Sequence, residues 1–148
     1  MRLKERKKKN NEVVQRIFVY QKLVEYNQLL FSLAKNHKVT NLTLFHDYGL
    51  KGLYLEEVSE IRKRKRLKRY QNIYDYMESE ELVDNLFRIV HTTAVLRKSK
   101  GYGTKDASII HYQVGLKVRK TIRDLGGTSP ELLPTPYQSI TEIKKEHF

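Results

Sequence analysis

The side chains best suited to chemistry in this sequence are cationic, and their densest group, the basic run, spans Arg62 to Arg69. Holding so much like charge together is costly unless an anion neutralises it, and the foremost candidate is a phosphate backbone. Such contacts would position the protein on a nucleic acid without reading its sequence. A solvated helix end and an acidic protein partner are the alternatives. The cations of the run are Arg62, Lys63, Arg64, Lys65, Arg66, Lys68 and Arg69.

Two further groups of cations are predicted to add to this contact. The basic arm, residues 1–10, is typical of segments that lie on phosphates or reach into grooves, with a solubilising tail as the alternative. Arg119, Lys120 and Arg123 belong to the polar side of a predicted helix that stops at Gly126. The cations of the arm are Arg2, Lys4, Arg6, Lys7, Lys8 and Lys9.

Aromatic residues near the same predicted helix are candidates for stacking or close approach. Tyr102 or Tyr112 could stack on an exposed base. Gly115 follows His111 and Tyr112 inside the helix, where Gly costs about 1 kcal/mol relative to Ala. This cost indicates close approach of another backbone or of a ligand, and packing against a neighbouring helix is the plainer interpretation.

The sequence holds no arrangement typical of a catalytic or metal site. Its His residues, at positions 37, 46, 91, 111 and 148, lack metal-ligand spacing, and Cys is absent. Asp47, Asp75 and Asp84 could converge as in a Mg²⁺-dependent nuclease, but nothing in their spacing indicates it. We therefore expect a protein that is not an enzyme and has no cofactor and no metal.

The length and the charge of the chain limit the classes of protein to which it can belong. A chain of 148 residues favours one domain with a modest core. The net charge of +12 is typical of a nucleic-acid-binding domain, while the apolar content of 39% is too high for pure disorder. No apolar run approaches the roughly 20 residues of a membrane span, and no secretory signal follows the basic start. We expect a cytoplasmic protein with no membrane contact.

Apolar residues recur at helical spacing, so we predict an all-α fold: a compact domain of about five to seven helices, residues 11–148, behind the basic arm. Gly49 and Gly52 are predicted to stop the second helix, Ser79 and Thr104 to cap later ones, and Ser139 with Glu142 to form a capping box near the C-terminus. The first helix is apolar nearly all round, which makes a homodimer possible. The predicted helices cover residues 11–36, 42–48, 55–64, 70–77, 79–100, 104–125 and 136–145.

Gly, Pro and aromatic residues form a spaced pattern over most of this region. The pieces are FHDYGLKGLY (45–54), YDYM (74–77), LFRI (86–89), HYQVG (111–115), VRKTI (118–122), LGGTSPELLPTP (125–136) and SI (139–140). Together they resemble the C-terminal region of the DNA-damage-inducible protein D family, from about Leu29 to Ile140. The resemblance implies a role in the bacterial or phage DNA-damage (SOS) response and names no reaction.

The sequence departs from the family pattern at two places. Longer members carry an N-terminal domain resembling the DNA-binding region of phage and baculovirus BRO proteins, which we expect this chain, opening on its basic arm, to lack. The family also tends to carry a Gln-Thr-Glu-Glu-like stretch after Arg88, where this chain has residues 91–95, HTTAV, without the acidic pair.

From these observations we predict a DNA-binding or DNA-repair accessory protein. It would clamp single- or double-stranded DNA, or a recombinase–DNA filament in DNA recombination, through the basic run and the basic arm. The alternative is a (phage-borne) protein-interaction inhibitor that uses its basic surface to occupy a host nucleic-acid-processing protein. RNA binding is a third possibility.

Overall fold

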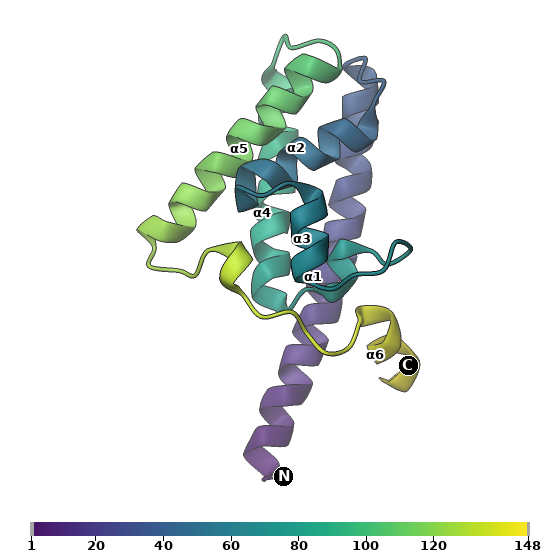
Figure 1. Ribbon diagram of the computed structural model, residues 1–148, viewed down its shortest axis with the longest axis vertical. Coiled ribbons are helices and arrows are strands. Elements are labelled where there is room, and N and C mark those ends of the chain that lie inside the picture. Colours follow the sequence, from purple (N-terminus) through teal and green to yellow (C-terminus); the bar gives the residue numbers. More distant parts are fainter. Residues whose placement is uncertain (1, 148) are drawn as a thin grey trace.

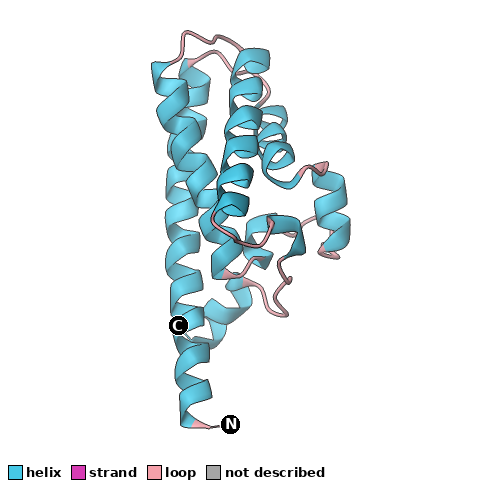
Figure 2. Ribbon diagram, turned by 90° about the vertical axis from the view of Figure 1, so that its left-hand side faces the viewer, coloured by secondary structure: helices cyan, strands magenta, loops and turns pink. Residues whose placement is uncertain are grey.

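The computed structural model describes residues 2–147, and every regular element in that range is helical, which confirms the all-α prediction (Figure 1). The long helix α1 runs along the molecule, and α2, α4 and α5 pack beside its upper part (Figures 1 and 2). The elements are α1 (Leu3–Asn36), α2 (Leu42–Tyr54), α3 (Val58–Arg64), η1 (Ile73–Tyr76), α4 (Ser79–Lys98), α5 (Thr104–Asp124), η2 (Pro130–Leu132) and α6 (Ile140–His147).

The basic arm is the start of α1 and not a separate segment. The helix begins at Leu3 and continues without a break to Asn36, whereas the sequence pattern placed its start at Asn11. Lys, Arg and Glu are good helix formers, so charge alone gives no reason for a break. Figure 1 shows these first turns projecting beyond the bundle, and residues 2–11 are all exposed.

The glycines of α2 do not end the helix, which corrects the predicted stop at residue 48. The helix passes through Gly49 and Gly52 to Tyr54 and ends where Leu55 adopts a left-handed conformation with φ 55°. A Cβ atom on Gly52 would collide with the backbone carbonyl of Tyr112 in α5. Small residues are therefore needed here because two helices meet backbone to backbone.

Gly115 of α5 is the counterpart of these glycines and lies against the backbone of α2. A Cβ atom there would lie 2.7 Å from the Leu53 nitrogen and 2.8 Å from the Gly49 carbonyl oxygen. Both neighbours are backbone atoms of a packed helix and cannot move aside cheaply. At this position the structure supports the plainer interpretation, packing against a neighbouring helix and not contact with a ligand.

One helix start and two helix caps differ from the predicted ones. Glu57 caps α3, which therefore begins at Val58 and not at Leu55, and Glu60 closes its capping box. Ser79 is the first residue of α4 and not its cap, because its hydroxyl donates to the Glu12 carboxylate of α1, 2.7 Å away. Thr104 is likewise the first residue of α5 and not its cap, because its hydroxyl faces the α1–α2 connection.

The hydroxyl of Thr104 accepts the backbone N–H of Thr40, 2.9 Å away, and that of Asn41. This joins the α1–α2 connection to the start of α5. At the other end of the chain, the Ser139 hydroxyl accepts the N–H of Glu142 and caps α6, as the sequence predicts. The terminal helix begins at Ile140, one turn later than residue 136.

Replacing Gly115 by Ala tests the backbone contact between α2 and α5 by the sign of its effect. Helix propensity alone predicts stabilisation by about 1 kcal/mol. The clash with Leu53 and Gly49 should reverse that sign and lower the free energy of unfolding by about 2 kcal/mol, measured in urea. Gln113→Ala, an exposed substitution on the same helix, serves as the control. A rise in the urea midpoint of the Gly115 variant would contradict the close packing.

Candidate nucleic-acid interface

The structure divides the basic run into buried and exposed cations. Lys65 is buried: its side chain is 0% exposed, and its ammonium lies 2.8 Å from the Glu81 carboxylate. It also donates to the Tyr76 carbonyl at 3.0 Å. The prediction that Lys65 contacts a phosphate is therefore wrong, because a phosphate cannot reach a side chain that is enclosed in the core.

Glu81 connects Lys65 to a chain of buried polar side chains that crosses the bundle. Its carboxylate accepts the hydroxyl of Tyr54, which in turn accepts an N–H of Asn85 at 3.0 Å. The Asn85 side-chain oxygen accepts a guanidinium N–H of Arg88 at 3.1 Å. Arg88 then donates to His111 on α5. Because each group has a fixed partner, the chain holds α2, α4 and α5 in one register.

The charges in this chain are set by burial and by their partners. Burial raises the pKa of the Glu81 carboxyl and lowers that of the Lys65 ammonium, and each charge opposes the shift of the other. Burial, followed by the adjacent Arg88 charge, moves the pKa of His111 well below its ordinary value. A neutral His111 donates from Nδ1 to the Phe45 carbonyl, 2.9 Å away. His111 is thus a core residue and not a stacking surface.

Two arginines of the basic run form contacts within the protein. Arg62 donates from Nη2 to the carbonyls of Lys68 and Arg69, at 2.6 and 3.3 Å, and so closes the turn after α3. Arg64 pairs with Glu56 at 2.9 Å. Both side chains are partly buried, so their charge is already used in organising the turn.

Four cations of the run remain exposed, and we call them the exposed quartet: Lys63, Arg66, Lys68 and Arg69. Within residues 2–147 none of them forms an ion pair with a carboxylate. Arg66 has a left-handed backbone with φ 57°, which helps to turn the chain back beneath α3. The quartet is the part of the run that a phosphate can reach.

The predicted contacts on α5 are of mixed kind. Arg119 is bound by the Glu131 carboxylate and by the Leu53 carbonyl, and only 15% of its side chain is exposed. Lys120 is exposed but lies 3.8 Å from Asp124, while Arg123 is exposed without an ion pair in the described part of the chain. Arg119 therefore fastens the segment around η2 to α5 and is unavailable as a phosphate contact.

The two candidate stacking tyrosines differ in their surroundings. Tyr102 is 64% exposed in the loop before α5. Tyr112 is partly buried and packs edge-on against Tyr48, with ring centroids 6.3 Å apart. Of the two, only Tyr102 presents an open ring.

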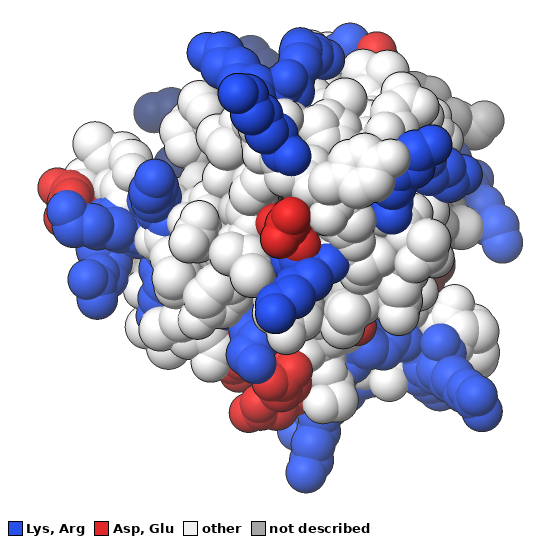
Figure 3. Space-filling view, turned by 90° about the horizontal axis from the view of Figure 1, so that it is seen from above, with Lys and Arg blue, Asp and Glu red and all other residues white. Residues whose placement is uncertain are grey.

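Tyr102 belongs to a second basic surface that the sequence pattern did not single out, which we call the end surface. The Gly103 N–H donates to the His37 carbonyl at 2.7 Å, which brings the end of α1 against the loop between α4 and α5. Viewed from this end, Lys and Arg side chains project around the face (Figure 3). The exposed cations from these segments are Lys35, Lys38, Arg97, Lys98, Lys100 and Lys105.

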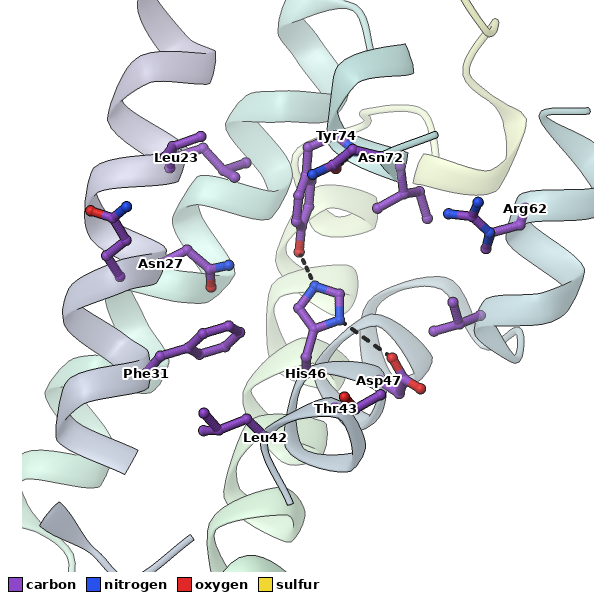
Figure 4. A pocket seen from close by; sticks show the side chains of 14 residues that line it. Leu23, Asn27, Phe31, Leu42, Thr43, His46, Asp47, Arg62, Asn72 and Tyr74 are labelled. Atoms are coloured by element: carbon purple, nitrogen blue, oxygen red, sulfur yellow. Dashed lines mark hydrogen bonds and ion pairs between the residues drawn. The ribbon is translucent and has the colours of Figure 1, made fainter. Parts of the chain in front are cut away.

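A cavity of about 530 Å³ opens beside the basic run, between α1, α2, α3 and η1 (Figure 4). Arg62 lines it on one side and Asn27 and Phe31 of α1 on the other. Its walls are mainly apolar. The polar side chains that line it are Asn27, Gln28, Thr43, His46, Asp47, Arg62, Asn72 and Tyr74.

A hydrogen-bonded relay forms one wall of this cavity. Arg88 donates to the Tyr74 hydroxyl at 2.9 Å, and that hydroxyl lies 2.9 Å from Nε2 of His46. Nδ1 of His46 faces the Asp47 carboxylate at 3.3 Å (Figure 4). The buried side-chain oxygen of Asn27 has no hydrogen-bond partner within residues 2–147. These hydrogen bonds tie the wall to the core. The Asn27 side-chain oxygen remains available to accept a hydrogen bond from a ligand.

Nε2 of His46 is hydrogen-bonded to the Tyr74 hydroxyl, and Thr43 supplies a hydroxyl to the cavity lining. No group of three or more His, Cys, Asp or Glu side chains suited to a metal ion occurs in residues 2–147. No helix in the same range is long and apolar enough to cross a membrane.

Comparison with known proteins finds one family and one curated relative. Residues 10–143 match the DinD C-terminal domain, so the match extends further toward the N-terminus than the resemblance seen from Leu29 onward. DNA damage-inducible protein D of Escherichia coli (strain K12) is 39% identical over 142 residues, which is 93% of this chain and 52% of the relative. The chain therefore spans about half the length of that protein. No solved structure matches.

Replacing Lys65 by Met tests whether this cation is structural. The change leaves the Glu81 carboxylate buried without its counter-charge, and we expect the free energy of unfolding to fall by about 3–5 kcal/mol in urea titrations. The double variant Lys65→Met/Glu81→Gln removes both charges and should recover much of that loss. If the single variant were as stable as the wild type, Lys65 would not be a core residue.

Proposed function

Since this chain belongs to the DinD C-terminal domain family, we propose that it acts in the DNA-damage response as an accessory protein that binds DNA and catalyses no reaction itself. The observation that carries the proposal is the exposed quartet. The fold neutralises Lys65 and Arg64 with its own carboxylates but holds four cations of the same run outward. Such a surface gains free energy when it replaces the counterions of a phosphate backbone.

The projecting start of α1 supports the same proposal. Five cations lie all round an exposed helix of about three turns, beyond the rest of the bundle, and the sixth, Arg2, caps its start. A single helix fits the major groove of DNA, and cations on its sides would contact the phosphates that border the groove. The quartet and the arm would then act as two parts of one electrostatic clamp, on DNA itself or on a recombinase–DNA filament.

The triple variant Lys63→Gln/Lys68→Gln/Arg69→Gln tests the clamp. These side chains are exposed, so the urea midpoint should stay near that of the wild type. Binding to labelled single-stranded DNA, followed by fluorescence anisotropy across a salt series, should weaken strongly. Each lost phosphate contact removes about 0.7 from the slope of log K against log salt, so three should remove about 2.

A matched control removes the same number of charges elsewhere. Lys22 and Lys51 already face carboxylates at 3.6 and 2.8 Å, and the Lys144 ammonium lies 5.5 Å from the centre of the Tyr20 ring. Replacing these three by Gln should alter the salt slope little. Equal weakening by both triple variants would show that only net charge matters and would overturn the assigned site. Parallel titrations with double-stranded DNA and with RNA decide between these substrates.

A second candidate function rests on exposed apolar side chains. Phe18 and Leu29 on the outer side of α1 are 58% and 55% exposed, and Phe87 on α4 is 43% exposed. The phosphate backbone offers no partner for such side chains, whereas an apolar protein surface does. This favours the alternative in which the chain inhibits a nucleic-acid-processing protein, and a second copy of the chain is another possible partner.

Phe18→Glu separates this candidate from direct DNA binding. The inhibitor interpretation expects a host protein to copurify with the wild type after nuclease treatment and to be lost with the variant. Direct DNA binding expects the variant to bind DNA with nearly unchanged affinity. Sedimentation velocity of both forms shows whether the partner is a second copy.

A further inference from the structure

We infer that the cavity between α1, α2, α3 and η1 receives an unstacked nucleobase from a single-stranded DNA held on the exposed quartet. This inference rests on the proposed function and adds a binding site to it. A surface of phosphate contacts accounts for affinity but has no place for a base. The cavity provides one, because it opens directly beside the turn that carries the quartet.

The size and walls of the cavity suit a flat, largely apolar ring. Its volume of about 530 Å³ lies within the range of small-molecule sites. Aliphatic side chains from four elements line it, and the Phe31 ring lies edge-on to His46, with centroids 6.1 Å apart. Single-stranded nucleic acids are held in this way, with bases placed against aromatic and apolar surfaces.

Amide side chains give the cavity groups that match a base edge. The Asn27 oxygen is buried without a partner among residues 2–147 and offers an acceptor. Asn72 uses its oxygen to accept the Tyr74 N–H at 2.8 Å, which leaves its NH₂ group free to donate. Bases carry donors and acceptors side by side on their edges, and Asn and Gln amides complement both.

The position of Arg62 links the base site to the phosphate site. Its Nη2 is fixed by the carbonyls of Lys68 and Arg69, and the guanidinium lines the cavity opposite Asn27 (Figure 4). A nucleotide with its base in the cavity would therefore meet a cation at the edge and the quartet beyond it. This continuity gives a strand one path across both sites.

Two other hollows lack this combination. The groove between α4 and α5 measures only about 190 Å³, and Lys117 is the one cation among its lining residues. A hollow near the start of α4 is lined by Glu12, Glu78, Glu80 and Glu81, whose charges repel phosphate. The groove also carries the amide of Gln113, but it is about a third of the size of the cavity and does not adjoin the basic run.

The test compares oligothymidylate with a strand of the same length that lacks bases. The wild type should bind the base-containing strand about tenfold more tightly, since each stacked base adds appreciably to affinity. Val24→Trp, at the edge of the cavity, should remove this preference and leave the affinity for the abasic strand unchanged. Asn27→Leu should reduce the preference without filling the space.

Val14→Trp is the matched control, because Val14 is 63% exposed on the same helix and does not line the cavity. Equal binding of both strands by the wild type, or no effect of Val24→Trp, would overturn the base site and leave the DNA clamp intact. If neither strand binds at low salt, the clamp fails. Thymidine monophosphate then tests the cavity alone: shifts of the His46 NMR resonances that Val24→Trp abolishes support the site, and their absence overturns it.

Discussion

The ion pair between Lys65 and Glu81 is the interaction on which the rest of this structure depends. It takes one cation out of a run of seven and places it at the centre of the protein, where both side chains are fully enclosed. With Lys65 in the core, Arg64 on one side of it lies partly buried against Glu56, and Arg66 on the other side is exposed. The pair therefore determines which cations face solvent, as well as how α3 and α4 are joined.

The same pair reaches the cavity through a continuous set of hydrogen bonds. Glu81 leads through Tyr54 and Asn85 to Arg88, whose guanidinium holds Tyr74 at the cavity wall. Gly49 allows α2 to lie close to Arg88 and His111, because a Cβ atom at this position would collide with both side chains. Core packing and the candidate binding surfaces are consequently parts of one arrangement, and damage to the first is expected to disturb the second.

Much of the fold follows from local patterns in the sequence. Helical spacing of apolar residues predicts the long helices, and capping chemistry predicts α6 at Ser139. Gly49 and Gly52 mislead because a glycine that ends a helix and one that admits a neighbouring backbone look the same in one dimension. The burial of Lys65 is likewise hidden, because its partner lies sixteen positions away and the predicted first turn of α4 already explains Glu81 by the helix dipole.

The binding surfaces were only partly predictable for the same reason. The basic run is visible in the sequence, but its division into structural and exposed cations depends on tertiary contacts. The end surface combines the termini of α1 and α4 with the start of α5, and it exists only because His37 and Gly103 meet. The cavity draws on four elements separated along the chain, and no single segment carries its pattern.

The most direct test of the division between buried and exposed cations is the reactivity of individual lysines toward an amine-acylating reagent. This reactivity is read by mass spectrometry with and without single-stranded DNA. We expect Lys63 and Lys68 to react readily in the free protein and to be protected by DNA. Lys65 should be unreactive in both states, because its ammonium is enclosed with Glu81. Ready labelling of Lys65, or no protection of Lys63 and Lys68 by saturating DNA, would contradict the division of the basic run between core and surface.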